Sequence, residues 1–217
     1  RIIQVKLLNM ERPDFVHLHL HSEYSLSDGI IRIKELVSRA SSLQYSAVGL
    51  TDLTNLFGLL EFYRSSREKG IKPIVGAEVN VIKDKDSLPA PIVLLVKDRQ
   101  GYINLTKIVS EAYVDGQVNG EPMVELSLLK KYSEGLIALS GGMEGHVGQS
   151  ILAGNIPLTE SRIKFFKSIF NEDFFIEVHR LGKTNEEEYN NAAVDIATKM
   201  DVPIVATNNV RFLMPID

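Results

Sequence analysis

The chain has 217 residues and a mass of 24.2 kDa, which suits one domain of ordinary size. Hydrophobic residues make up 44% and charged residues 24%, a balance that excludes a disordered tail. The 24 basic and 28 acidic side chains give a net charge of −4, which argues against a domain whose main task is to grip nucleic acid. With 0 Cys, disulfides and thiolate metal sites are excluded, and no apolar run is long enough to cross a bilayer. We therefore expect a cytoplasmic protein with no membrane contact.

Residues 1–9 are interpreted as a leader or added extension, because Met10 directly before Glu11 is a suitable native start. The domain is then expected to span residues 10–217. Seven short segments rich in Val, Ile, Leu or Phe are predicted as strands buried on both faces of a parallel sheet. In chain order they are 15–20, 47–50, 73–81, 92–96, 136–139, 174–178 and 203–206.

Between the predicted strands, apolar residues recur at helical spacing and predict amphipathic helices. Thr184 and Glu187 are predicted to form a capping box at the start of the last helix. Segments 83–90 and 115–122 are rich in turn-forming residues and are predicted to be surface loops. The helical faces are Ile33, Leu36, Val37, Ala40 and Leu43; then Ile163, Phe166 and Phe170; and last Tyr189, Ala192, Ala193, Ile196 and Met200.

Strand–helix alternation predicts an α/β fold with parallel strands and right-handed crossovers. A closed or nearly closed barrel is favoured, and an open doubly wound sheet is the alternative. In both architectures the chemistry belongs at the carboxyl ends of the strands. Polar residues gather at these predicted ends: His19, His21, Thr51, Asp52, Glu78, Ser140, His179, Thr207, Asn208 and Asn209.

The first predicted strand carries three histidines at alternate positions, His17, His19 and His21. Alternate side chains of a strand share one face, so these imidazoles point the same way. Two neutral imidazoles two residues apart can converge on one zinc, manganese or iron ion. Hydrogen-bonded structural histidines are the competing interpretation, and the pattern alone leaves both open.

Several ordered blocks between Phe15 and Leu213 resemble one family. The chain is similar to the amino-terminal PHP (polymerase and histidinol phosphatase) domain of the bacterial replicative DNA polymerase III alpha subunit. The resemblance implies a distorted (β/α)7 barrel with its site at the carboxyl ends of the strands, where metal-binding members hydrolyse phosphoesters. The blocks are FVHLHLHSEYSLSDG, TDLTNLFGLLEFY, GIKPIVGAEVNV, KDRQGYINLTKIVSEAY, EGLIALSGG and VPIVATNNVRFL.

The resemblance carries four metal-ligand positions to this chain: His19, His21, Asp28 and Glu78. At five further positions it implies ligands that this chain lacks. These degenerate positions are Leu53, Pro91, Gly142, Asn209 and Arg211. His146 and His179 match no ligand of the family and are interpreted as surface or rim histidines.

Loss of ligands on several strands at once predicts a domain that binds no catalytic metal cluster and is hydrolytically inactive. Arg211 would place a fixed positive charge where a cation should bind, and we expect it to pair with Glu78, Asp28 or Asp52. Its repulsion of a cation would amount to about 4 kcal/mol per unit charge at 4 Å and an effective dielectric near 20. One weakly bound divalent ion at His19 and His21 stays open.

The resemblance further implies that this chain is part of a longer DNA-directed DNA polymerase acting in DNA replication. The parent's nucleotidyltransferase site, with its magnesium, would lie in a palm domain downstream. The implied partners are the rest of the alpha subunit, the proofreading exonuclease (epsilon-type) subunit, and DNA through the parent protein. Two alternatives stay open: an active PHP phosphoesterase or 3′–5′ exonuclease with ligands moved to His17, Asp52 or His179, and a stand-alone hydrolase of histidinol-phosphatase type.

Overall fold

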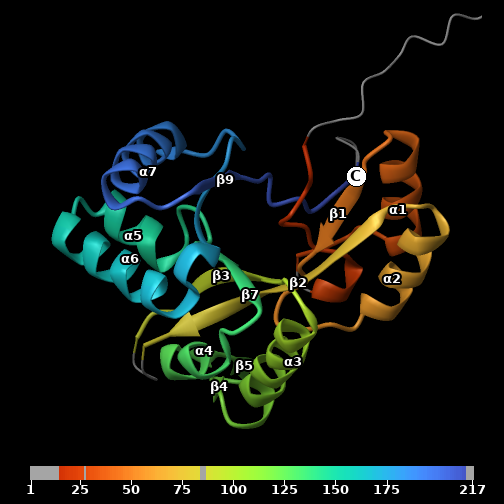
Figure 1. The fold of residues 1–217 in the computed structure, drawn as a ribbon, viewed down its shortest axis with the longest axis horizontal. Helices are drawn as coiled ribbons and strands as arrows, with labels where there is room; N and C mark the ends of the chain where they lie inside the picture. The colour runs from red at the N-terminus through yellow and green to blue at the C-terminus, as the bar shows by residue number, and fades with distance from the viewer. Residues whose placement is uncertain (1–14, 27, 84–86, 214–217) are drawn as a thin grey trace, which may run out of the picture.

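A computed structural model describes residues 15–26, 28–83 and 87–213 of the chain. Helices surround the strands on the outside, with α1 and α2 beside β1, α3 and α4 at the bottom of the view, and α5 to α7 grouped on the left (Figure 1). The α-helices are α1 (Ile33–Ser42), α2 (Leu59–Glu68), α3 (Arg99–Val114), α4 (Leu126–Tyr132), α5 (His146–Leu152), α6 (Ile156–Phe170) and α7 (Glu186–Met200). The strands are β1 (Ala47–Leu50), β2 (Lys72–Ile82), β3 (Ala90–Val96), β4 (Gln117–Val118), β5 (Glu121–Pro122), β6 (Val124–Glu125), β7 (Leu136–Leu139), β8 (Phe174–Val178) and β9 (Ile204–Ala206).

Within these residues the main sheet has the order β1-β2-β3-β7-β8-β9, with β6 paired to β2. The prediction of an all-parallel sheet is wrong at one strand. β3 runs antiparallel to both β2 and β7, whereas β1–β2, β7–β8 and β8–β9 are parallel. Only a short loop joins β2 to β3, and such a loop suits an antiparallel pair because parallel neighbours need a long crossover. The amino end of β3 therefore lies at the same rim as the carboxyl ends of β1 and β7.

The predicted first strand, 15–20, does not form a regular strand. The amide of Gly49 donates to the carbonyl of His17 at 2.7 Å, and that of Thr51 donates to Leu20 at 2.9 Å. The two acceptors, His17 and Leu20, are three residues apart, whereas the two donors, Gly49 and Thr51, are two residues apart. This mismatch interrupts the regular ladder as a bulge does. On its other side, Leu20 bridges Val210 in parallel. The segment therefore still joins β1 to the chain that follows β9.

The three predicted helices are confirmed as α1, α6 and α7, while α2 to α5 were not predicted. The predicted capping box is wrong, because Asn185 precedes α7 in a left-handed conformation without a side-chain cap. Instead, both carboxylate oxygens of Glu186 accept from the amide of Leu181 at 2.8 Å. Segment 115–122 contains a two-stranded hairpin, β4–β5, whose Asn119 and Gly120 have φ of 54° and 84°. An Asn-Gly pair at positive φ is the preferred connection of a two-residue hairpin.

The predicted loop 83–90 ends where Ala90 begins β3, and its residues 84–86 lie outside the described residues, as do residues 1–9. A hydrophobic core lies between the sheet and helices α3 to α7, and a second one between β1 and helices α1 and α2. No helix in the described ranges is long and apolar enough to span a bilayer.

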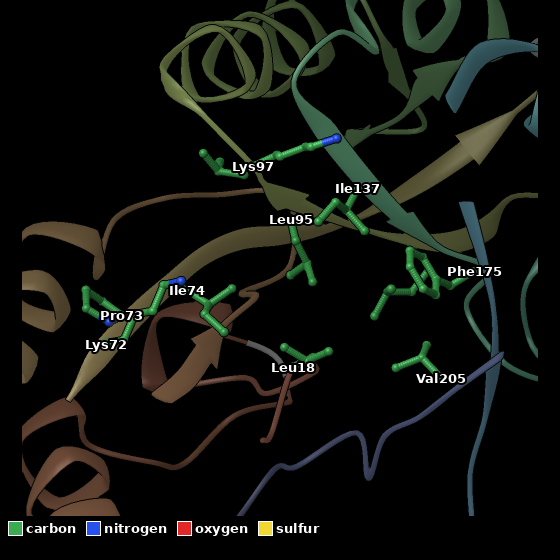
Figure 2. Close-up of a pocket in the computed structure, with 11 residues that line it drawn as sticks. Leu18, Lys72, Pro73, Ile74, Leu95, Lys97, Ile137, Phe175 and Val205 are labelled. Carbon is green, nitrogen blue, oxygen red and sulfur yellow. The ribbon is translucent and has the colours of Figure 1, made fainter. Parts of the chain in front are cut away.

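The inside of the barrel is apolar at the end opposite the carboxyl rim. There, a cavity of about 400 Å³ lies among the first residues of β2, β7 and β8. Figure 2 shows Ile74, Leu95, Ile137, Phe175 and Val205 pointing toward this common space. The charged residues in its lining are Lys72 and Lys97, and Lys97 pairs with Asp173 at 2.6 Å.

Candidate functional site

His19 and His21 are fixed between β1 and the chain that follows β9. The amide of His21 donates to Val210 at 2.9 Å, and the amide of Val210 donates to His19 at 3.0 Å. The exposed fractions of His19 and His21 are 2% and 0%. His17 takes another environment, with its ring 5.1 Å from that of Phe15. The structure thus brings two of the three predicted histidines into one buried site.

His19 lies between two carboxylates. Its Nε2 is 2.6 Å from Oε2 of Glu78, and its Nδ1 is 2.9 Å from Oε1 of Glu177. Burial lowers the pKa of His19, but the charges and hydrogen bonds of Glu177 and Glu78 outweigh it and raise the pKa to about 9. Both ring nitrogens face a carboxylate oxygen, so without a metal the imidazolium form of His19 can donate two hydrogen bonds.

Glu177 on β8 was not predicted as a site residue, although it is fully buried. Its Oε2 accepts from the amide of Gly141 at 3.1 Å, and its Oε1 accepts from the hydroxyl of Thr207 at 2.5 Å. Burial raises the pKa of Glu177, but the charge of His19 and contact with His179 hold it well below its usual range. The signal in the sequence was a glutamate inside the apolar run FFIEV, since a buried carboxylate must find partners.

His179 lies beside Glu177, with Nε2 3.3 Å from Oε1 of that residue. Its exposed fraction is 8%, so the interpretation of His179 as a surface histidine is wrong, while its position at the rim is confirmed. His146 is part-buried elsewhere, and its Nε2 is 3.1 Å from the carbonyl of Val81. Burial, and then the charge of Arg162, lower the pKa of His146.

Arg211 reaches into the site from the chain after β9. Its Nη1 contacts Oδ2 of Asp28 and Nδ1 of His21, and its Nη2 lies 3.9 Å from Oε2 of Glu78. Burial lowers the pKa of Arg211 to about 10, which leaves the guanidinium charged at neutral pH. The expected pairing with Asp28 and approach to Glu78 are therefore present.

The expected alternative of Asp52 as a partner of Arg211 is wrong. One carboxylate oxygen of Asp52 accepts from the amide of Ser22 at 2.6 Å and from the hydroxyl of Ser25 at 3.0 Å. Burial raises the pKa of Asp52, and the hydrogen bonds from Ser22 oppose this shift. Asp52 thus holds the turn that follows His21.

The four other degenerate positions surround the same site. Leu53 bridges Glu78, and Pro91 lies in β3 opposite Asn80. Gly142 lies against the ring of His179, and Asn209 has a buried Oδ1 without a hydrogen-bond partner. Leucine, proline and glycine side chains offer no metal ligand.

Two sets of donors in this site could hold a metal ion. His19, His21 and Glu78 each place one donor atom within 4.8 Å of the others, and so do His19, Glu177 and His179. Both sets use His19, and the guanidinium of Arg211 lies against His21 and Asp28. Among the residues of the described ranges, each of these two donor sets could hold one metal ion.

Two curated relatives, both named DNA polymerase III subunit alpha, match nearly the whole chain. The Vibrio cholerae protein is 40% identical and the Escherichia coli K12 protein 43% identical, each over 206 residues. These matches cover 94% of this chain but 18% of each relative, so the chain spans about a fifth of their length.

Solved structures share the fold at low sequence identity. A protein assigned as a metal-dependent phosphoesterase, from Bifidobacterium adolescentis, has a TM-score of 0.59 and 14% identity over 91% of this chain and 87% of its own. An amidohydrolase from Chromobacterium violaceum, with bound sulfate and no metal, has a TM-score of 0.59 and 16% identity over 90% of this chain and 87% of its own. These likenesses establish a mixed α/β fold with a curled sheet, consistent with a distorted barrel.

The model of the PHP domain family matches residues 17–181, which is more than half of the chain. That range begins at the histidine-rich segment and reaches past Glu177 and His179. The chain belongs to the PHP domain family.

Proposed function

We propose that this chain is the amino-terminal PHP domain of a DNA polymerase III alpha subunit and that the domain is catalytically inactive. Identity of 40% and 43% to two such subunits over 94% of the chain supports the parent. The parent would be a cytoplasmic DNA-directed DNA polymerase, and the acids and magnesium that transfer nucleotides would lie outside this chain. The domain itself would span residues 10–217 of a longer polymerase chain.

The contacts of Arg211 with Asp28, His21 and Glu78 carry the proposal of inactivity. A hydrolytic metal site must hold its ions, keep a coordination position open and lower the pKa of a bound water. A guanidinium among these ligands repels an incoming cation and neutralises the carboxylates that would attract it. His19, His21, Asp28 and Glu78 would then be remnant positions joined by ion pairs.

The role that follows is structural. The barrel keeps a continuous apolar core between its sheet and helices, although the catalytic ligands have been replaced. Such a domain would support the polymerase core and dock the proofreading exonuclease subunit. Deleting it from the parent subunit is expected to lower both the thermal stability of the polymerase and its co-purification with the exonuclease subunit. If both were unchanged, the scaffold role would be wrong.

An assay of the purified chain tests inactivity. We expect no release of nucleotides from 3′-labelled DNA and no hydrolysis of p-nitrophenyl phosphate in the presence of Mn²⁺, Mg²⁺ or Zn²⁺. The matched control is a variant that carries Leu53→His, Asn209→Asp and Arg211→His together. These changes restore metal-ligand side chains at three of the degenerate positions. Turnover by the unmodified chain, abolished by His19→Ala, would overturn the proposal.

A second candidate is an active metal-dependent phosphoesterase. It is favoured by the second donor set around His19, which includes His179, a residue outside the family's expected ligands.

A third candidate function, that of a stand-alone hydrolase, is distinguished by the length of the encoding gene. A stop codon directly after Asp217 would exclude the polymerase parent.

A further inference from the structure

Three buried residues form a cluster separate from the residues that Arg211 contacts: His19, Glu177 on β8, and His179 directly after β8. Nδ1 of His19 and Nε2 of His179 lie 2.9 Å and 3.3 Å from the same atom, Oε1 of Glu177. All three residues are at least nine-tenths buried, with exposed fractions of 2%, 8% and 0% for His19, His179 and Glu177. Nε2 of His179 has no hydrogen-bond partner, although it is buried and faces this carboxylate.

An unpartnered buried nitrogen costs free energy unless a ligand satisfies it. The distances suit a metal, because two donors of a tetrahedral zinc ion with bonds of 2.0–2.1 Å lie about 3.3 Å apart. Two imidazoles and one carboxylate are also a donor set that suits zinc. The cluster therefore has both a donor that lacks a partner and the spacing of a zinc site.

The backbone at position 142 makes room for the imidazole of His179. A Cβ on Gly142 would lie 2.5 Å from Cε1 and 2.7 Å from Nδ1 of that ring. Any other residue at this position would thus overlap His179. The imidazole of His179 can therefore take this position only because residue 142 has no side chain.

The three donors are oriented by further hydrogen bonds. Glu78 faces Nε2 of His19 at 2.6 Å, which leaves Nδ1 of that ring toward Glu177. Thr207 and the amide of Gly141 hold the carboxylate of Glu177. Carboxylates and backbone groups that orient ligands in this way raise metal affinity.

We propose that His19 through Nδ1, Glu177 through Oε1 and His179 through Nε2 bind one zinc ion. Glu78 is a positioning residue for His19 rather than a ligand of this ion. The ion links β8 to the histidine segment, and the three protein ligands leave the fourth tetrahedral position to a water molecule. The inference goes beyond the proposed scaffold function and does not require hydrolysis.

Titration of the EDTA-treated, dialysed 217-residue chain with ZnCl₂, followed by calorimetry, tests this site. We expect one zinc per chain and a rise in Tm on zinc addition. His179→Ala should weaken zinc binding at least tenfold, and His146→Ala, a change of the same type outside the cluster, should leave it within twofold. Co²⁺ should give visible absorption bands typical of tetrahedral coordination in the unmodified chain and not in His179→Ala.

His21→Gln separates this cluster from the remnant set of His19, His21 and Glu78. Retained zinc binding in His21→Gln, together with its loss in His179→Ala, supports the proposal. Loss in His21→Gln with retention in His179→Ala would overturn it, and so would the absence of binding to the unmodified chain. Circular dichroism checks that each variant is folded, and since neither outcome depends on hydrolysis, failure here leaves the proposed function standing.

Discussion

The ring of His179 occupies the space that a side chain at position 142 would need. A Cβ on Gly142 would lie 2.5 Å from Cε1 of His179, closer than nonbonded carbons approach in folded proteins. The backbone at Gly142 also has φ of 60°, in the left-handed region that costs other residues about 1–2 kcal/mol. Position 142 therefore requires glycine for two reasons: the positive φ of its backbone and the nearby imidazole of His179.

Gly142→Ala is expected to lower the free energy of unfolding by about 1–3 kcal/mol, through backbone strain and overlap with His179. In the His179→Ala background the overlap is absent, so the same change should cost less. Urea unfolding of the four proteins of this double-mutant cycle measures the difference. Strict additivity would show that the two positions do not interact.

Arg211→Met is expected to destabilise the domain by about 1–2 kcal/mol, since it leaves Asp28, His21 and Glu78 without the guanidinium. The value is modest because the side chains of Arg211 and Asp28 are 26% and 37% exposed, and water screens their attraction. Arg211→Lys keeps the charge and should recover part of the loss in chemical denaturation. A variant as stable as the unmodified protein would mean that Arg211 does not stabilise these acids.

Glu186 should make stability depend on pH. Burial raises the pKa of Glu186, but the hydrogen bonds from the amides of Leu181 and Gly182 outweigh it and lower the pKa below the ordinary value of 4.5. A lowered pKa in the folded state adds stability that is present above about 4.5 and lost as the pH falls through the folded value. Glu186→Gln should thus cost about 1–2 kcal/mol near pH 7 and less near pH 3. If urea titrations showed the same loss of stability for Glu186→Gln near pH 7 and near pH 3, this explanation would be contradicted.

Gly101 in α3 contacts the backbone of another segment. A Cβ at this position would lie 1.8 Å from the carbonyl oxygen of Gly135, and a backbone atom cannot move aside as a flexible side chain can. We expect Gly101→Ala to destabilise the domain by about 2–3 kcal/mol, despite the higher helix propensity of alanine. Gly70→Ala is a useful comparison, because a Cβ there meets nothing within 4 Å while its φ of 71° carries the backbone cost alone. Equal losses in thermal unfolding would exclude the steric explanation.

The sequence by itself determined where most strands lie and which residues meet at the rim. Short apolar runs predicted β1, β2, β3, β7, β8 and β9 because local burial patterns report on strands directly. Alternation along the histidine segment predicted that His17, His19 and His21 share one face, and two of them, His19 and His21, lie in the site. The resemblance and the charge of Arg211 predicted a pairing with Glu78, Asp28 or Asp52, and Arg211 lies against Asp28 and approaches Glu78. These inferences depend on neighbours in sequence, on the resemblance and on the charge of one residue.

Only the tertiary structure decided the direction of β3, the irregular first segment, and the roles of Glu177 and His179. Strand direction depends on which edges pair, and that is set by contacts between residues far apart in the chain. The role of Glu177 depends on its hydrogen bonds with His19, which is 158 residues away in the chain, and with Thr207. A buried carboxylate can be charged only where such partners converge, and that convergence is a property of the folded chain.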